Sequence, residues 1–223
     1  MQRNSSHSSR LITTSRDRTE SPPLLLATRS AGKIRELRPM FAAAGVQVLS
    51  LDEARVAETL DEETLENAST FEQNALAKAR HFHRASGLPT VADDSGLEVA
   101  ALDGGPGVHS KRWSGRPDLS GQALDDENNA LLLRRLERSD HRHARYVCAA
   151  AYCDAEMEWV ERGEVAGRIT RAPRGAGGFG YDPYFESDEL ARTFGEVSSD
   201  EKARVSHRAR AFAKLLQRLA SRR

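Results

Sequence analysis

The feature that most constrains the fold is the alternation of short apolar runs with amphipathic helical segments in the first half of the chain. Apolar runs at residues 24–28 and 46–51 predict buried strands. Helical spacing follows at 30–45, where Ser30 is the expected N-cap, and again at 70–87. Strands that alternate with helices in this way predict an α/β fold with a mixed central sheet flanked by helices.

The rest of the chain is consistent with this architecture. Two strands are predicted at 89–92 and 97–102, joined by a turn at Asp93–Gly96. Apolar spacing predicts helices at 121–138 and 199–220. Strand-like stretches at 144–153 and 158–169 predict an antiparallel pair.

The charge balance excludes several classes of partner. Lys and Arg number 33 and Asp and Glu number 33, so no overall field attracts nucleic acid or an anionic membrane. The longest apolar runs are far shorter than the roughly 20 residues that span a bilayer. The chain has neither an HExxH nor a GxSxG motif, so zinc-hydrolase and serine-hydrolase chemistry has no support.

The two cysteines indicate the compartment. Cys148 and Cys153 are five residues apart in a strand-like stretch, so their side chains should point to opposite faces and form no local disulfide. A cytoplasmic, reducing environment fits this usage best.

The first 23 residues differ in composition from the remainder. They hold six Ser, three Thr and four Arg against two acids, a mixture that buries too little apolar surface to offset its ordering entropy. We therefore expect a disordered tail over 1–23 and one folded domain over 24–223. A transit peptide and an upstream start codon are the alternatives for the tail.

An acidic pair and a glycine-rich loop form the first candidate site. Asp93 and Asp94 follow an apolar strand, where open sheets form ligand crevices, and adjacent acids there can bind a divalent cation. The alternative is a solvated turn. Three Gly and one Pro between residues 103 and 107 suit close backbone approach to a ligand, and Lys111 and Arg112 follow as donors for phosphate.

Two further clusters lie near the end of the chain. In the stretch 177–183, glycines free the backbone, Phe179 and Tyr181 offer aromatic faces and Asp182 offers an acceptor. An aromatic face of this kind stacks a nucleobase with about 1–3 kcal/mol in nucleic-acid sites. The alternative is a tight turn with core aromatics. The last cluster is Lys202 with Ser206-His207-Arg208.

Taken together, these stretches resemble the inosine triphosphate pyrophosphatase family, whose members hydrolyse noncanonical purine nucleoside triphosphates such as ITP and XTP. Five blocks match in order along nearly the whole predicted domain: Leu26–Glu36, Thr70–Ala79, Ala92–Leu97 continuing to Gly107 and Arg112, Gly178–Pro183 and Ser206–Arg208. The resemblance implies two lobes with a central cleft, a homodimer, and a purine nucleoside triphosphate substrate that is cleaved to the monophosphate and pyrophosphate.

The resemblance also implies roles for individual residues. Asp94 matches the general base and, with Asp93 and Gln73, the Mg²⁺ site. The expected substrate contacts are Thr28, Arg29, Ser30, Ala31, Gly32, Lys33, Ser95, Lys111, Arg112, Phe179, Gly180, Tyr181, Asp182, Lys202, His207 and Arg208.

The chain departs from the family pattern at two positions. Arg29 stands where the first loop usually has Gly, and it adds a possible phosphate contact. Gln73 stands where the helix block usually has a Glu that binds magnesium, and a neutral amide should lower metal affinity. Gln73 also fits a capping box opened by Thr70.

Other functions remain as alternatives. A Maf-like pyrophosphatase would act on other nucleoside triphosphates, although the Ser206–Arg208 block argues against it. A nucleotide-binding module without catalysis is suggested by Arg29 and Gln73. A nucleic-acid role through the Arg-rich tail has the least support, because basic residues elsewhere are matched by acids.

Overall fold

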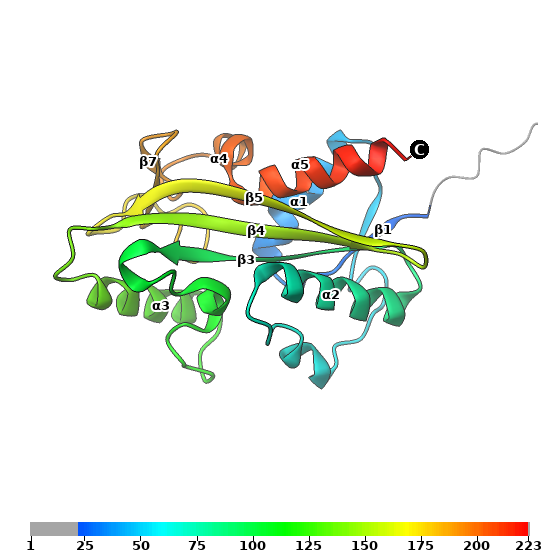
Figure 1. Cartoon of the computed structure of the whole chain (residues 1–223), viewed down its shortest axis with the longest axis horizontal. Helices are drawn as coiled ribbons and strands as arrows, with labels where there is room; N and C mark the ends of the chain where they lie inside the picture. Colours follow the sequence, from blue (N-terminus) through cyan, green and yellow to red (C-terminus); the bar gives the residue numbers. More distant parts are fainter. Residues whose placement is uncertain (1–21, 223) are drawn as a thin grey trace, which may run out of the picture.

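The protein folds around one mixed seven-stranded sheet (Figure 1), seen here in a computed structural model that describes residues 22–222. The tail predicted over residues 1–23 lies outside the described residues, except for Pro22 and Pro23. The strands are β1 (Leu24–Leu26), β2 (Val48–Ser50), β3 (Thr90–Val99), β4 (His143–Cys153), β5 (Glu158–Ile169), β6 (Phe185–Ser187) and β7 (Arg192–Thr193). Their order is β2-β1-β3-β4-β5-β6-β7. β1 is parallel to β2 and β3, whereas the remaining neighbours are antiparallel. The predicted mixed sheet is therefore confirmed.

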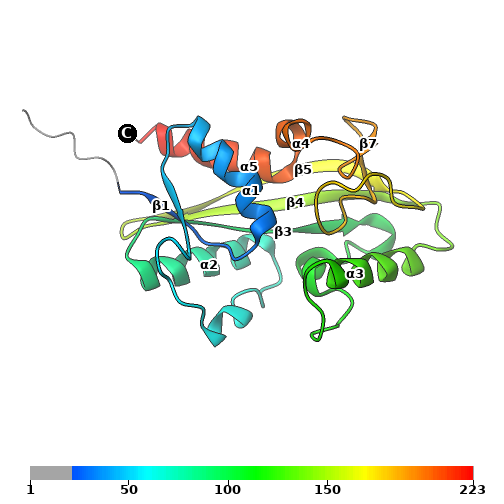
Figure 2. The same cartoon turned by 180° about the vertical axis from the view of Figure 1, so that it is seen from behind.

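Helices cover both faces of the sheet. The α-helices are α1 (Ala31–Ala43), α2 (Phe71–Ser86), α3 (Gly121–Arg135), α4 (Ser199–Val205) and α5 (His207–Ala220). The 3-10 turns are η1 (Leu60–Thr64), η2 (Ala100–Leu102) and η3 (Gly107–Arg112). Viewed from either side, α2 and α3 lie below the long strands, α4 and α5 lie above them, and α1 runs from beside α5 down to the level of the strands (Figures 1 and 2).

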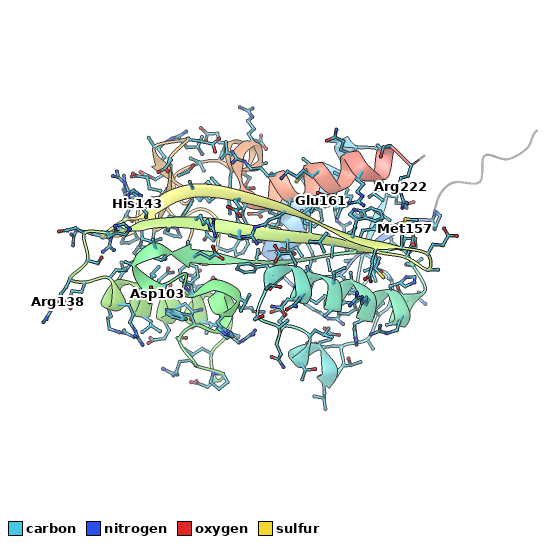
Figure 3. The ribbon with its side chains drawn as sticks, viewed as in Figure 1. Asp103, Arg138, His143, Met157, Glu161 and Arg222 are labelled. Atoms are coloured by element: carbon cyan, nitrogen blue, oxygen red, sulfur yellow. The ribbon has the colours of Figure 1, made fainter. Side chains whose placement is uncertain are left out.

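The core divides according to the two-residue period of the strands, and side chains fill the space on both sides of the sheet (Figure 3). Leu24 and Leu26 pack into the apolar cluster that contains residues of α1 and α5, whereas Leu25 and Ala27 pack into the cluster that contains residues of α2. β1 is buried on both sides, which explains why its sequence is uniformly apolar.

The helix termini follow the capping signals of the sequence. Ser30 Oγ accepts a hydrogen bond from the Lys33 N–H, and Thr70 Oγ1 accepts one from the Gln73 N–H. Gly87 ends α2 in the left-handed conformation. The helix predicted over 199–220 is instead two helices, because extended Ser206 interrupts it and caps α5.

The predicted turn at Asp93–Gly96 is wrong. β3 continues through these residues, and Asp93, Asp94 and Ser95 are paired with Ala150, Ala149 and Cys148 of β4. Pairing with β4 outweighs the local turn propensity of an Asp-Ser-Gly sequence. Because side chains alternate along a strand, Asp93 and Asp94 point to opposite faces of the sheet.

The two cysteines also lie on opposite faces, as their spacing predicted. Cys148 belongs to the cluster with α5 residues and Cys153 to the cluster with α2 residues, and both thiols are free and buried.

In the part of the chain that the structure describes, no helix has the length and apolar character that crossing a membrane requires.

Close packing between β5 and α5 generates a stability prediction. A Cβ at Gly163 would collide with the backbone carbonyl of His207 and the backbone nitrogen of Ala211. We expect Gly163→Ala to lower the free energy of unfolding by about 1–3 kcal/mol, as overpacking generally does. Urea denaturation measures the difference. Ala166→Ser, at an exposed position of the same strand, is the control and should stay within about 0.5 kcal/mol. Equal midpoints for the two variants would contradict the prediction.

Candidate active site

A cavity of about 980 Å³ is the candidate site. It is lined by residues of α1, α2 and β3, of the segment 58–66 and of the stretch 108–128. The predicted residues that line it are Thr28, Arg29, Ser30, Gly32, Lys33, Asp94, Ser95, Lys111, Arg112, Phe179, Gly180, Tyr181, Asp182, Lys202, His207 and Arg208. Ala31, Asp93 and Gln73 were predicted as well, but they do not line the cavity. Tertiary structure thus gathers five sequence blocks into one cleft.

The first wall of the cleft is the start of α1. Thr28 Oγ1 accepts a hydrogen bond from the Ser30 N–H at 3.1 Å, which shapes the loop before the helix. The N-terminus of a helix and the Lys33 ammonium together suit a bound anion. A Cβ on Gly32 would lie 2.9 Å from the Phe179 ring, so this loop directly contacts the aromatic wall.

Arg29 has a different role from the phosphate contact that its position suggested. Its Nε and Nη2 donate to the two carboxylate oxygens of Glu62 at 3.1 and 2.7 Å, and Nη2 also donates to the Val56 carbonyl. The hydrogen bond to Glu62 raises the pKa of Arg29 and lowers that of Glu62. Arg29 therefore anchors the acidic segment 52–66 at the edge of the cleft.

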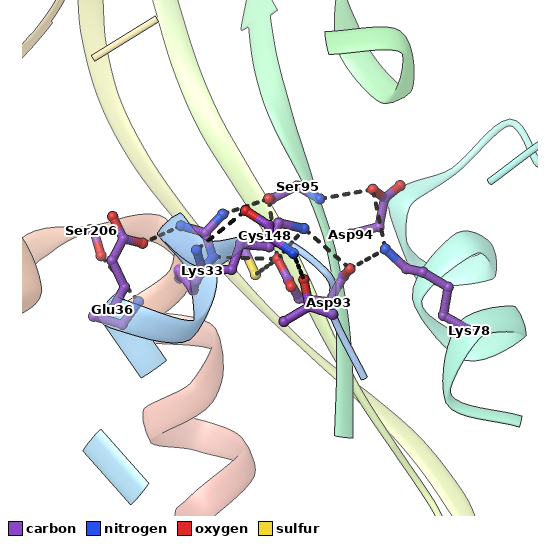
Figure 4. A network of polar contacts seen from close by, with 12 residues as sticks. Lys33, Glu36, Lys78, Asp93, Asp94, Ser95, Cys148 and Ser206 are labelled. Carbon is purple, nitrogen blue, oxygen red and sulfur yellow. Dashed lines mark hydrogen bonds and ion pairs between the residues drawn. The ribbon is translucent and has the colours of Figure 1, made fainter. Parts of the chain in front are cut away.

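Asp93 lies on the α1 and α5 side of the sheet. Its Oδ2 is 3.0 Å from Lys33 Nζ and 3.3 Å from Arg208 Nε, and it accepts a hydrogen bond from Ser95 Oγ (Figure 4). Burial raises the pKa of this carboxyl, but Lys33, Arg208 and Lys78 outweigh it and lower the pKa. Asp93 thus pairs with two cations, Lys33 and Arg208. The sequence had predicted that it binds a metal ion together with Asp94, but the two carboxylates lie on opposite faces of the sheet.

Asp94 lies on the other face of β3, toward α2 (Figure 4). Asn74 Nδ2 donates to Oδ2 at 2.9 Å, the Ser95 N–H donates to Oδ1 at 3.0 Å, and Lys78 Nζ is 3.9 Å away. Burial raises the pKa of Asp94, Lys78 opposes that rise and nearby Glu66 adds to it. The result is an oriented carboxylate that is a stronger proton acceptor than an exposed aspartate.

Lys78 links Asp94 to a second carboxylate. Its ammonium is 2.6 Å from Glu66 Oε1 and also bonds the Asp93 carbonyl. Burial raises the pKa of Glu66, but Lys78 and Lys33 lower it to about 2. Asn74, Lys78 and Glu66 were not predicted as site residues. Asn74 and Lys78 are polar residues four apart on a mainly apolar helix face, which is the signal that could have identified two of them.

The predicted metal ligands Asp94, Asp93 and Gln73 do not come together. Gln73 is exposed on α2, and Glu72 pairs with Arg162 instead of turning inward. Between residues 22 and 222, no three His, Cys, Asp or Glu side chains are grouped to hold a metal ion. Glu66 and Asp94 are nevertheless two carboxylates that face one ammonium, a donor set that suits Mg²⁺ when phosphate oxygens complete the shell.

The aromatic wall is built on glycines. Gly178 and Gly180 have φ values of +75° and +63°, and Asp182 Oδ2 accepts from the Phe179 N–H at 2.8 Å. Lys202 Nζ is 2.5 Å from the same oxygen, and the Tyr146 hydroxyl donates to Oδ1. Both oxygens of Asp182 therefore bind protein donors. Asp182 therefore shapes the wall through these bonds.

Phe179 and Tyr181 differ in their exposure. The Phe179 ring is half-buried, with Lys202 Nζ 5.0 Å and Arg208 Cζ 5.7 Å from its centroid. Tyr181 is only 5% exposed, and its hydroxyl donates to the Ser110 carbonyl at 2.8 Å. Phe179 thus provides the accessible aromatic surface, while Tyr181 joins two loops.

His207 and its neighbours complete the floor of the cleft. The His207 ring stacks on Tyr146 with centroids 4.6 Å apart, and its buried Nδ1 has no partner among the described residues. Burial and the nearby cations hold its pKa well below the ordinary value, so the imidazole is neutral. Glu36, which was not predicted, accepts from both Lys202 and Arg208.

This chain is similar to known proteins over most of its length. The Ham1 family profile matches residues 24–218. A dITP/XTP pyrophosphatase of Mycolicibacterium paratuberculosis is 50% identical over 203 residues, which cover 88% of this chain and 95% of that protein. The protein of the same name from Mycobacterium tuberculosis strain H37Rv is 49% identical over 200 residues, 89% of this chain and 95% of its own.

Solved structures show the same fold. A HAM1 protein from Coxiella burnetii aligns with a TM-score of 0.77 and 34% identity, covering 90% of this chain and 99% of that chain. A dITP/XTP pyrophosphatase from Mycobacterium abscessus aligns with a TM-score of 0.67 and 41% identity, covering 88% and 99%.

The raised pKa of Asp94 generates a prediction about stability. A carboxyl whose pKa is higher in the folded than in the unfolded state destabilises the fold where it is ionised, by about 1.4 kcal/mol per pKa unit. We expect Asp94→Asn to raise the melting temperature at pH 7, with a gain that disappears as the pH falls below the ordinary aspartate pKa. Thermal denaturation at pH 7 and at about pH 3.5 measures both values. A less stable variant at pH 7 would contradict the assignment.

Proposed function

This chain belongs to the Ham1 family, and we propose that it hydrolyses noncanonical purine nucleoside triphosphates, such as ITP, dITP and XTP, to the monophosphate and pyrophosphate. Relatives named dITP/XTP pyrophosphatase align with it over about 95% of their own length. The observation that carries the proposal is the arrangement of the cleft. Asp94, an oriented carboxylate, shares one cavity with a lysine-bearing helix N-terminus and with the face of Phe179.

The start of α1 is the proposed polyphosphate site. Thr28, Arg29, Ser30, Gly32 and Lys33 line the cavity at this helix N-terminus, and in this proposal the Lys33 ammonium and the backbone N–H groups not bonded within the loop donate to phosphate oxygens. Lys111 and Arg112 also line the cavity, and Arg112 bonds the Glu66 carbonyl and lies 3.6 Å from the Glu66 carboxylate. Exposed Lys111 turns toward the bound polyphosphate in this proposal, and its charge, with that of Lys33, stabilises the leaving pyrophosphate.

Asp94 is the proposed general base. It takes the proton of a water molecule that attacks the α-phosphorus, and the bond to pyrophosphate breaks. Asn74 and the Ser95 N–H hold its two oxygens in a fixed orientation. Lys78 neutralises the growing negative charge around the attacked phosphorus from the same side of the sheet.

Magnesium is the proposed cofactor, and Asp94 with Glu66 would hold it. Mg²⁺ binds through one or two carboxylates together with substrate phosphates and water, which agrees with the two carboxylates found here. When bound, the ion neutralises phosphate oxygens and lowers the pKa of a coordinated water. In its absence, Lys78 compensates the charge of both carboxylates.

The Phe179 side of the cleft is the proposed base site. The Phe179 ring offers a stacking surface, while Lys202, Arg208 and neutral His207 line the cavity beside it. Hypoxanthine and xanthine carry a carbonyl at position six, which accepts from these donors. Adenine carries an amino group there, which cannot accept from these donors, and this mismatch disfavours it.

The two residues that suggested a binding module without catalysis, Arg29 and Gln73, give that alternative no support in the structure. Gln73 lies outside the cleft and Arg29 is engaged with Glu62, so neither departure from the family pattern disturbs Asp94.

We also propose that residues 24–223 act as a single domain in a cytoplasmic homodimer. Two free buried thiols support a reducing compartment. Light scattering of the purified protein would measure the mass, and a monomer at micromolar concentration would refute the dimer.

An assay of pyrophosphate release tests the proposed activity. With Mg²⁺ present, ITP and XTP should turn over faster than GTP, dATP or UTP. Asp94→Asn should lower kcat by about 10²–10⁴-fold, since it retains shape but cannot take the proton. Undiminished turnover in Asp94→Asn would remove the base assignment, and ITP binding without turnover in the wild type would favour the binding module. Preference for UTP would favour the Maf-like alternative.

A magnesium titration tests the proposed ligand pair. Glu66→Gln should raise the Mg²⁺ concentration for half-maximal activity roughly tenfold or more, because it removes one of two carboxylates. Gln73→Glu is the matched variant and should leave the titration unchanged, since residue 73 is exposed and outside the cavity. If Gln73→Glu lowered the Mg²⁺ concentration for half-maximal activity and Glu66→Gln left it unchanged, residue 73 and not Glu66 would be the magnesium ligand.

A further inference from the structure

We propose that α3 is the positioning element of the base site, with Asp125 and Asn129 fixing the peptide groups of Gly180 and thereby setting which bases the cleft accepts. The inference rests on the proposed function, because it assumes that the Phe179 loop receives the base. No residue of α3 was among the site residues predicted from the sequence.

The contacts come from one face of one helix. The Gly180 N–H donates to Asp125 Oδ2 at 2.9 Å, and Asn129 Nδ2 donates to the Gly180 carbonyl at 3.0 Å. Residues four apart lie on the same side of a helix, so the two side chains grip both backbone groups of a single glycine. Asn129 is buried, and Asp125 lines the cavity.

The loop needs such support because of its composition. Gly177, Gly178 and Gly180 surround Phe179, and glycine loses more conformational freedom on ordering than any other residue. Asp182 holds the loop through the Phe179 N–H, on one side of the ring. On the other side of the ring, the α3 contacts hold Gly180 itself, between the ring and Tyr181, whose hydroxyl is bonded to Ser110.

The same helix holds the loop on the facing side of the cleft. Asn128 Oδ1 accepts from the Ser114 N–H at 2.7 Å, and its Nδ2 donates to the Lys111 carbonyl at 2.9 Å. The bond between the Tyr181 hydroxyl and the Ser110 carbonyl then joins the two loops directly. Helix α3 is therefore a common support for the 110–114 loop and for the aromatic wall (Figures 1 and 2).

A shift of Gly180 would disturb the base site more than it would disturb the phosphate site. The Phe179 ring lies close against Gly32, so its position sets the space beside the start of α1. Lys33 is held separately, by Asp93 on β3. Loss of the α3 contacts should therefore weaken recognition of the base and leave the phosphate end intact.

The experiment compares Asp125→Ala and Asn129→Ala with wild type in full-length protein. For each we would measure kcat and KM with ITP and GTP, and the Kd of pyrophosphate by calorimetry. We expect the KM for ITP to rise roughly tenfold and the preference for ITP over GTP to fall, the size of effect that one lost hydrogen bond gives. The kcat and the Kd of pyrophosphate should change less than about twofold, which is within the scatter of a neutral change.

Two further variants separate positioning from a general structural effect. Asp125→Asn keeps an oxygen that can accept from Gly180, so it should restore most of the wild-type preference. Asp126→Ala is the matched control, because Asp126 is exposed and its only hydrogen bond in the described chain comes from Gln122. It should behave as wild type does.

The outcomes are distinct. An unchanged KM and base preference in both alanine variants would overturn the proposal, and so would an equal loss of pyrophosphate affinity. If Asp125→Ala does not fold, as judged by circular dichroism, Asn129→Ala and Asp125→Asn give the same comparison. Wild-type protein that turns over no nucleoside triphosphate would refute the proposed function instead, and the Kd of ITP in the same variants would then test the α3 contacts alone.

Discussion

The pairing of β3 with β4 is the constraint on which the rest of the site depends. Because the strand continues through Asp93 and Asp94, alternation sends two adjacent carboxylates to opposite faces of the sheet. One becomes a counter-ion for Lys33 and Arg208, and the other becomes a carboxylate that Asn74 and the Ser95 N–H orient beside Lys78. A turn at this point would have left both aspartates solvated and equivalent. The backbone thus gives two identical residues different chemistry.

Buried charge in the cleft is arranged so that few groups lack a counterpart. Glu36 pairs with both Lys202 and Arg208, and Asp93 pairs with both Arg208 and Lys33. Lys202 also pairs with Asp182. Burying a single ion of this set would be costly, and removing one partner leaves another uncompensated. The cations are therefore already oriented before an anionic substrate arrives, so less ordering is needed on binding.

The sequence was most informative where a residue acts through its local backbone. The caps at Ser30 and Thr70, the end of α2 at Gly87 and the glycine-rich wall were all predictable, because propensity and turn chemistry are short-range. The sequence was least informative about which side chains contact each other over long distances in the chain. Nothing near Arg29 in the chain indicates that its guanidinium binds Glu62, 33 residues away. The support of Gly180 by α3 likewise spans more than 50 residues.

By itself, the sequence determined the class of fold, the family and the blocks that line the cleft, because these follow from hydrophobic period, composition and motif order. Tertiary structure decided what each polar residue does. Gln73 and Asp94 belong to matched blocks, yet one faces solvent and the other the cleft, since helix phase and strand register set the direction of a side chain. Glu66 and Lys78 gained their place beside Asp94 only when α2 packed against β3, a contact that no local pattern encodes.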